Sequence, residues 1–428
     1  MANQVSRILI LSLVFRPDNV STAQLMADLA VDLQARGHHV TVMTTLPHYN
    51  PDAAAAMDQP MRQMWCGLLW RSYYRGIEVF HVWMPAKGRH KLYRILTWLG
   101  FHLISILASL AKCRSLDVIL SPSPPLTIGL AAWILARCSK ARYIYNVQEL
   151  YPDVAINLGA IRSRWVIEQL YRLERFIYRH SAAVTVISPR MRDRVLAKGV
   201  PMDKVKLIPN GVDVMGFSPA PKDNPFSRQH HLQECFVVGY AGNMGIPQRL
   251  EILVAAAELL RDRSDIRILL MGNGSERHRL DLLIENSRLP NVTFLPQQSY
   301  SVMPEAYAAI DLAYVPQALG TSNDGVPSKV YRILASGRPV LACTDPSSDL
   351  AALIQDADAG LVVTDGRAES VALAIRSAAD DKVACGIWGA NGRRLVLRQY
   401  ERSLVSNAYS EIIGEVAMGG KEPTRQCV

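Results

Sequence analysis

Apolar runs bounded by polar turns recur along the chain and alternate with amphipathic stretches. Continuous runs such as RILILSLVF (7–15) and CFVVGYAG (235–242) are typical of parallel strands buried on both faces. A helical pattern, LMADLAVDLQARG, follows the first run and ends at Gly37, a residue type that commonly terminates helices. Repeated strand–helix–strand units predict an α/β fold with doubly wound parallel sheets and ligands at the carboxyl ends of the strands.

One stretch interrupts the alternation. Residues 213–234 contain four Pro or Gly residues, mixed charge and no apolar period, so we expect a linker there. The strand–helix pattern then restarts, and a chain of 428 residues is too long for a single core of usual size. We therefore predict two Rossmann-like domains, 1–217 and 218–398, followed by a C-terminal helix at 399–428 that packs on either of them.

The stretch LYRILTWLGFHLISILASLA (92–111) is long enough to span a bilayer, but it is periodic. Its large aliphatic residues follow helical spacing and form one face: Leu92, Ile95, Leu96, Leu99, Leu103, Ile106, Leu107 and Leu110. The opposite face carries Arg94, Trp98, Phe101, His102, Ser105, Ser109 and Lys112. Because a spanning helix rarely presents Arg or His to lipid, we interpret the stretch as a domain helix with a membrane-facing side. An ordinary core helix with a basic rim is the alternative.

Charge and tryptophan concentrate around this helix. The formal net charge is +9, and residues 60–115 hold nine Lys or Arg residues against Glu78 alone, with four of the seven tryptophans. Basic and aromatic side chains together suit an anionic bilayer surface, and the contact residues that we expect are Arg89, Lys91, Arg94 and Trp98. No nucleic-acid-binding motif accompanies the patch, so a nucleic acid partner is not expected.

The cysteines indicate the compartment. Seven are scattered along the chain without a Cys-x-x-Cys pair, which disfavours a disulfide framework or a zinc site and favours a reducing cytosol. The opening MANQVSRILILSLVF has too short an apolar run for a signal peptide and continues into a strand pattern. We expect a cytoplasmic protein at the inner face of the cytoplasmic membrane.

Several motifs resemble those of the GT-B glycosyltransferases of family 4. IPNGVD (208–213) with FSP (217–219) resembles the hinge between their domains, GNGSE (272–276) a turn after a strand, and LASGRPVLA (334–342) the end of their signature helix. PHYN, QELYPDVAINLG, YAGNMG and VPSKVYRILASGRPV resemble bacterial surface-polysaccharide transferases of the amino-sugar or fucosamine type. The resemblance extends from Arg7 to about Val416.

This resemblance implies a retaining transferase of the hexosyl or N-acetylhexosaminyl class. The nucleotide sugar, expected to be UDP-linked, binds the C-terminal domain, and a lipid-linked glycan acceptor binds the N-terminal domain across a cleft. No metal or other cofactor is expected, because such enzymes neutralise the leaving diphosphate with side chains and a helix N-terminus. Two other functions remain open, a nucleotide-sugar 2-epimerase and a catalytically degenerate binding subunit.

The leaving diphosphate calls for cationic contacts. The family carries an Arg after a strand and a Lys five residues later, and these positions hold Asn243 and Gln248 here. We therefore predict Lys329 first and Arg249 second as the positive groups, with Asn243 and Gln248 as neutral donors. For Arg249, a solvated helix end is the alternative.

The segment before Gly337 adds further donor candidates. The family's pair of glutamates, eight positions apart, corresponds to Asp324 and Arg332. Asp324 can accept a hydrogen bond from a sugar hydroxyl, whereas Arg332 has no acceptor and faces either solvent or a phosphate. Ser328, after Pro327, is expected to cap the helix or to offer its hydroxyl to phosphate. The alternative is an ordinary capped helix with an exposed Lys329.

The acceptor side is expected at YNVQELYPD, the end of a central strand. Glu149, with Gln148 beside it, is the candidate base for the acceptor proton, since a carboxylate at the carboxyl end of a strand faces the ligand. Asp153 is a further acceptor-side candidate, and helix capping is the alternative for both carboxylates. His48 and Tyr49 are expected to line the acceptor entrance, or else to form a turn.

Overall fold

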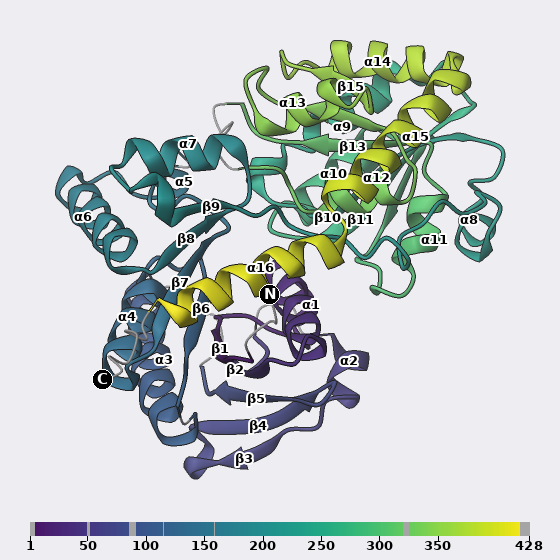
Figure 1. Ribbon diagram of the computed structural model, residues 1–428. Helices are drawn as coiled ribbons and strands as arrows, with labels where there is room; N and C mark the ends of the chain where they lie inside the picture. Colours follow the sequence, from purple (N-terminus) through teal and green to yellow (C-terminus); the bar gives the residue numbers. More distant parts are fainter. Residues whose placement is uncertain are drawn as a thin grey trace, which may run out of the picture. The chain divides into compact units, whose positions relative to one another are not determined.

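The computed structural model describes residues 5–48, 52–84, 91–113, 115–157, 159–319 and 325–419, without the side chains of residues 53–54 and 91–95. Over these ranges the chain divides into two compact units (Figure 1). Unit 1 comprises the residues up to Asn210 and those from Ser403 onward, and unit 2 comprises Gly211–Arg402. The chain therefore leaves unit 1 once and returns to it for its last helix.

Unit 1 is built on a sheet with the strand order β3-β4-β5-β2-β1-β6-β7-β8-β9. From β5 to β9 neighbouring strands are parallel, and the order reverses between β1 and β6. Apolar cores lie on both faces of the sheet. The strands are β1 Arg7–Leu11, β2 His39–Thr45, β3 Arg62–Met64, β4 Leu69–Tyr74, β5 Ile77–Val82, β6 Val118–Pro122, β7 Arg142–Val147, β8 Ala183–Val186 and β9 Val205–Leu207.

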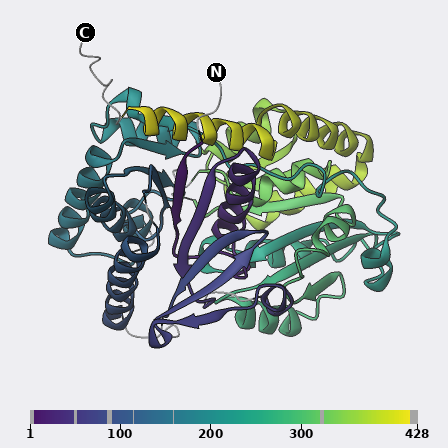
Figure 2. The same cartoon turned by 60° about the horizontal axis from the view of Figure 1, so that its bottom comes forward.

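Most helices of unit 1 lie between these strands in the chain, and the last one follows unit 2. The helices are α1 Ser21–Ala35, α2 Ala53–Met57, α3 Lys91–Lys112, α4 Thr127–Ser139, α5 Asp153–Asn157, α6 Arg164–His180, α7 Pro189–Ala197 and α16 Arg402–Met418, with the short 3-10 helices η1 Trp65–Gly67 and η2 Met202–Lys204. The last of them, α16, lies beside α1 in both views (Figures 1 and 2), where Arg36 donates hydrogen bonds to Asn407 and to the carbonyl of Ser403.

An antiparallel ribbon at one sheet edge was not predicted. Strands β3, β4 and β5 pair antiparallel, and Arg75 and Gly76 both have positive φ in the turn between β4 and β5. Two such residues form the tight turns that suit hairpins. Part of the basic, tryptophan-rich window therefore belongs to a sheet edge.

Helix α3 packs on α4 with its smaller, more polar face inward. Phe101, Ser105 and Ser109 are buried, and His102 Nε2 lies 2.9 Å from Thr127 Oγ1 of α4. Burial lowers the pKa of His102 to about 4, so this ring is neutral in the core. The leucines of the other face point outward, with Leu96, Leu99, Leu103, Leu107 and Leu110 between 41% and 65% exposed. None of the helices in the described ranges has the length and apolar content that a bilayer crossing requires.

Unit 2 contains a parallel sheet with the order β12-β11-β10-β13-β14-β15. Its strands are β10 Phe236–Asn243, β11 Ile266–Asn273, β12 Val292–Leu295, β13 Leu312–Pro316, β14 Val340–Cys343 and β15 Gly360–Val363. Its helices are α8 Pro225–Gln229, α9 Glu251–Leu259, α10 Arg277–Asn286, α11 Met303–Ala308, α12 Lys329–Ala335, α13 Asp349–Asp356, α14 Ala368–Asp380 and α15 Lys382–Gln399, with the 3-10 helix η3 Ile246–Gln248.

The strand order of unit 2 reverses between β10 and β13. In doubly wound sheets ligands bind outside the carboxyl ends of the strands at such a reversal. Both units thus confirm the predicted doubly wound α/β fold. Residues 213–234 differ from the expected linker, because Phe217, Phe226 and Leu232 are buried in a core of unit 2.

Candidate functional site in unit 2 and its counterpart in unit 1

The ammonium of Lys329 lies at the carboxyl end of β10, where the sheet order reverses. Lys329 is the first residue of α12, and its Nζ lies 3.9 Å from the centroid of the Tyr240 ring. Gly242 is beside it, since a Cβ atom at that position would lie 3.4 Å from this nitrogen. With φ of +145°, residue 242 is in a conformation that favours glycine. Glycine at this position therefore leaves the ammonium open to close approach.

Lys329 has no carboxylate partner among the residues that the structure describes. Burial alone lowers the pKa of its ammonium to about 7. The ring of Tyr240 supplies a cation–π contact, and the Tyr240 hydroxyl donates to the carbonyl of Asn243 at 2.5 Å. A partly desolvated cation that faces only a ring gains from an anionic ligand, because the anion compensates the charge.

A polar network fixes the chain that enters α12. Gln317, directly after β13, donates from Nε2 to the carbonyl of Gly325 at 2.9 Å. Thr344, directly after β14, donates to Gln317 Oε1 at 3.0 Å. Sequence reasoning missed Tyr240, Gln317 and Thr344. The last two could have been found from their positions just beyond the carboxyl ends of β13 and β14.

The predicted neutral donors lie on the loop after β10. Asn243 is exposed at the strand end, and Gln248 is half-buried. Gln248 Oε1 accepts the Gly245 N–H at 3.0 Å, so its oxygen stabilises the turn. Arg249 has φ of +42° and its Nε lies 3.5 Å from Glu251 Oε1. Its roughly half-exposed side chain is thus paired with a carboxylate, unlike that of Lys329.

The structure describes two further candidates on the segment before Gly337. The guanidinium carbon of Arg332 lies 5.6 Å from the Phe217 ring centroid and 5.1 Å from that of Tyr300, and the residue is half-buried. Its expected contact with solvent or a phosphate stays a prediction. Ser328 precedes α12 but forms no side-chain capping hydrogen bond, which corrects the expected cap. Asp324 lies outside the described residues.

In unit 1, Gln148 and Glu149 follow β7 and have different environments. The Gln148 amide is buried and exchanges hydrogen bonds with Asn210, at 3.2 Å as donor and 2.9 Å as acceptor. It also donates to Asn146 Oδ1 at 2.8 Å, and Asn146 in turn donates to Tyr409 of α16 at 2.8 Å. Glu149 is exposed. These contacts suit Gln148 to holding the strand end in place, and the catalytic roles predicted for Gln148 and Glu149 stay predictions.

Asp153 lies in a buried ionic cluster between α5, α6 and α7. Its Oδ1 accepts from the Tyr171 hydroxyl at 2.6 Å, and its Oδ2 lies 3.1 Å from Arg194 and 2.9 Å from Lys198. Burial opposes the ionised form, but Tyr171, Lys198 and Arg194 together hold the pKa of Asp153 below its usual value. These contacts give Asp153 a structural task, and its acceptor-side role stays a prediction.

The remaining predicted residues lie elsewhere in unit 1. His48 follows β2, with its Nδ1 2.9 Å from Thr45 Oγ1, and thus occupies the carboxyl edge of the sheet. Trp98 is half-buried on α3. Tyr49 and Arg89 lie outside the described residues, as do the side chains of Lys91 and Arg94. Nowhere in the described ranges do three or more His, Cys, Asp or Glu side chains gather as a metal site would require.

Comparison with known proteins matches two family domains to the chain. The glycosyl transferase 4-like domain matches residues 22–211, and the glycosyl transferases group 1 domain matches residues 235–381. Among curated proteins, WcaI of Escherichia coli (strain K12), a glycosyl transferase assigned to colanic acid biosynthesis, is 26% identical over 360 residues. This alignment covers 82% of this chain and 86% of WcaI.

Solved structures share the fold over nearly the whole length of the chain. Sucrose-phosphate synthase from Thermosynechococcus elongatus matches with a TM-score of 0.76 and 19% identity, covering 96% of this chain and 100% of that one. Anabaena HepE, crystallised in complex with UDP, matches with a TM-score of 0.71 and 15% identity over the same shares. At these identities the likeness establishes the fold and no more.

Proposed function

Since the chain belongs to the GT-B glycosyltransferases with a glycosyl transferase 4-like and a group 1 domain, we propose that it builds a bacterial surface polysaccharide. It moves a hexosyl or N-acetylhexosaminyl group from a UDP-linked donor to a lipid-linked glycan, with retention of configuration. The similarity to WcaI supports the pathway class, and the UDP complex of HepE supports the nucleotide. Donor binding is assigned to unit 2 and acceptor binding to unit 1.

The observation that carries this proposal is the Lys329 ammonium at the carboxyl end of β10, without a carboxylate in the described part of the chain. Breaking the bond between the anomeric carbon and the diphosphate leaves negative charge on a phosphate oxygen. A cation that is already in place stabilises that charge more strongly than water does. Lys329 therefore binds the diphosphate and stabilises it as the leaving group, a task for which no metal ion is needed.

On unit 1, Glu149 acts as the base. The acceptor hydroxyl transfers its proton to the Glu149 carboxylate while its oxygen bonds to the anomeric carbon on the face from which the diphosphate leaves, so configuration is retained. The electron pair of the broken bond remains on the diphosphate. The Gln148–Asn210 amide pair holds the chain at the end of β7. His48, at the end of β2, contributes to the acceptor side.

Donor binding is expected to weaken as pH rises above 7. The free ammonium of Lys329 has a pKa of about 7, lowered by burial, and a bound diphosphate raises it again. Binding then takes up a proton, so affinity falls by up to about tenfold per pH unit between the free and bound pKa values. Calorimetric titration with UDP-glucose from pH 6 to 9 measures this affinity, because the phosphates of UDP-glucose do not titrate in that range. Arginine stays charged over this range, so the affinity of the Lys329→Arg variant should not fall with pH in this way. An equal pH dependence of affinity in the variant and the wild type would refute the assignment of Lys329.

Membrane association is proposed from the outward face of α3. Its leucines are exposed, and Lys112 Nζ at the end of the same helix lies 5.9 Å from the ring centroid of Trp65. Leu68 and Trp83, both exposed, are joined by a backbone hydrogen bond on the neighbouring ribbon. An apolar helix face with tryptophan and lysine at its border suits the headgroup region of an anionic bilayer. The alternative of an ordinary core helix does not explain this outward face.

The variant Leu103→Glu/Leu107→Glu is expected to lose vesicle binding. Each leucine contributes about 1.5–3 kcal/mol when buried in an apolar medium, so affinity should drop well over tenfold. Cosedimentation with anionic vesicles measures this. Leu282→Glu/Leu373→Glu is the matched control, because both leucines are exposed on unit 2. Equal binding by the two variants would contradict the membrane role.

The proposed reaction is tested with labelled nucleotide sugars and bacterial lipid extract. Label that enters the lipid fraction supports transfer. A free nucleotide sugar with an inverted C2 centre would instead indicate the epimerase, and binding without turnover would indicate the degenerate subunit.

A further inference from the structure

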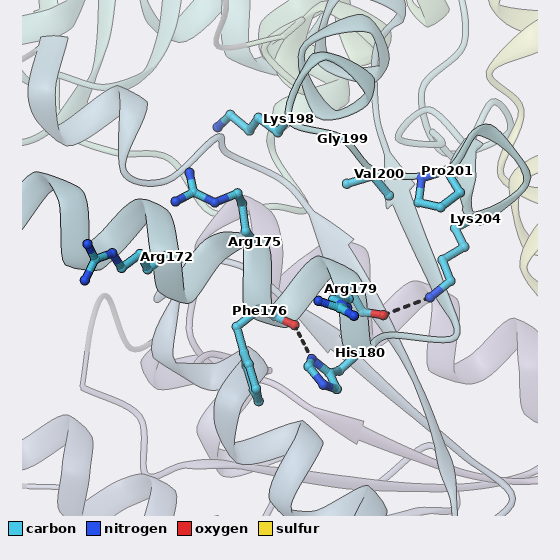
Figure 3. Close-up of a pocket in the computed structure, with 10 residues that line it drawn as sticks. All are labelled: Arg172, Arg175, Phe176, Arg179, His180, Lys198, Gly199, Val200, Pro201 and Lys204. Carbon is cyan, nitrogen blue, oxygen red and sulfur yellow. Dashed lines mark hydrogen bonds between the residues drawn. The ribbon is translucent and has the colours of Figure 1, made fainter.

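A basic cavity of about 590 Å³ lies in unit 1, against α6 and the loop that leads into β9 (Figure 3). Its charged lining includes Arg172, Arg175, Arg179, Lys198 and Lys204, and none of the described residues that line it is acidic. His180 and Lys204 come shortly before β8 and β9, so the cavity borders the amino ends of these strands. Of the candidates in unit 1, Asp153 contacts the lining residue Lys198, whereas Glu149 and His48 follow the carboxyl ends of β7 and β2.

Two of these cations are neutralised by neighbours. Arg172 forms an ion pair with Glu168 at 2.6 Å. Lys198 Nζ lies 2.7 Å from a Glu174 oxygen and 2.9 Å from Asp153, both of them buried. Neither Arg172 nor Lys198 thus brings much uncompensated charge to the cavity.

The other three cations are not compensated. Lys204 Nζ donates to the carbonyls of Arg179 and Ser181 at 2.9 and 3.1 Å, and both of these acceptors are neutral. Within the described ranges, the guanidinium groups of Arg175 and Arg179 have no ion-pair partner. Three positive charges gathered around one hollow repel one another, and an anionic ligand relieves that repulsion.

Helix α6 brings the arginines to one side of the cavity. Arg172, Arg175 and Arg179 are three and four positions apart on α6 and share one side of the helix. Phe176, on the same helix, packs against His180 with tilted rings at 4.1 Å and edge to face against Trp133 of α4 at 5.0 Å between ring centroids. The cavity therefore has a packed aromatic wall beside its cationic side.

We propose that this cavity is a second anion site, which binds a phosphorylated ligand through Arg175, Arg179 and Lys204. Guanidinium groups hold phosphate oxygens in a bidentate manner, and two of them with an ammonium match a phosphomonoester or a diphosphate. Phe176, Val200 and Pro201 offer apolar surface to the organic part of the ligand. The phosphate comes either from a soluble organic phosphate or from an anionic lipid headgroup, and the site is independent of donor binding at Lys329.

Binding of two different probes tests the proposal and separates the sources. Full-length protein is titrated calorimetrically with pyrophosphate, in a Lys329→Ala background that removes the predicted donor contact. Cosedimentation with phosphatidate-containing vesicles, compared with neutral vesicles, tests the lipid source. The test variant is Arg175→Glu/Arg179→Glu. Lys382→Glu/Arg398→Glu is the control, with the same change of charge at exposed positions of unit 2.

The test variant should bind at least one of the two probes about tenfold or more weakly than the control, since two charge-assisted contacts are lost. Loss of pyrophosphate binding identifies a soluble phosphate, and loss of phosphatidate binding alone identifies a headgroup. If both probes bind the test variant and the control equally, the proposal is wrong. Arg175→Gln/Arg179→Gln, compared with Lys382→Gln/Arg398→Gln, replaces the glutamate variants if the melting temperature shows that they unfold.

Discussion

Replacement of Lys329 by alanine is expected to lower kcat/KM for sugar transfer by about 100-fold or more, the size of effect seen when one preorganised donor to a developing anion is removed. The reason is the position of the ammonium at the end of β10, held over Tyr240 and beside Gly242. The positive charge of Lys329 stabilises the leaving diphosphate, whose negative charge grows as its bond to the anomeric carbon breaks. Initial rates at varied donor concentration measure the loss.

The control for this experiment is Lys382→Ala, which removes an exposed lysine from the same unit and should leave kcat/KM unchanged. The Lys329 variant is expected to fold, because the buried ammonium carries a desolvation cost that alanine removes. A kcat/KM within about threefold of the wild-type value would be too small for an electrostatic contact to the leaving group. Such a result would show that Lys329 does not take part in the reaction.

Lys198→Ala is expected to destabilise the protein by about 3–5 kcal/mol at pH 7, because it leaves a buried carboxylate without its partner. Glu174 is fully buried, and both of its oxygens accept from Lys198 Nζ, at 2.7 and 2.9 Å. Burial raises the pKa of Glu174, whereas the Lys198 ammonium and the Tyr178 hydroxyl lower it. Urea unfolding of the variant and the wild type measures the difference.

The pH dependence separates this cause from simple loss of packing. Without Lys198, the folded-state pKa of Glu174 rises further above the value in the unfolded chain, so the loss of stability should shrink as pH falls and Glu174 becomes protonated. The double variant Lys198→Ala/Glu174→Gln removes the unpaired charge and should recover part of the loss. A loss below about 1 kcal/mol would show that the pair contributes little, and a larger loss that does not change with pH would show that lost packing is its cause.

The sheets could be predicted because buried parallel strands leave a strong pattern. RILILSLVF and CFVVGYAG, continuous apolar runs, form β1 and β10 at the centres of their sheets. The ribbon from β3 to β5 was missed, because its basic and aromatic residues were interpreted as a membrane surface alone. The alternation in LWRSYY and IEVFHV, with Arg75-Gly76 between them, was the available signal.

Periodicity could not determine which face of α3 is buried. Its spacing separates a leucine face from a face with Phe101, His102 and two serines, and either could point inward. Ser105 and Ser109 are small enough for close packing, and His102 finds Thr127 on α4. Packing against α4 therefore determines which face of α3 is buried, and this orientation could not be predicted from the sequence of α3 alone.

The sequence indicated which residue types the candidate site needs, but not which side chains they contact. Lys329 was selected because a diphosphate requires a cation, but its place over Tyr240 depends on how α12 packs in the folded unit. Arg332 illustrates the limit, since its guanidinium contacts Phe217 and Tyr300, which lie on distant segments of the chain. Such pairings arise only in the folded unit.

The most direct measurement is a crystal structure of the protein with UDP. The diphosphate is expected outside the carboxyl ends of β10 and β13, with an oxygen about 2.7–3.2 Å from Lys329 Nζ and close to Gly242. UDP bound elsewhere, with Lys329 still resting on the Tyr240 ring, would contradict the assignment of this edge of unit 2 as the donor site.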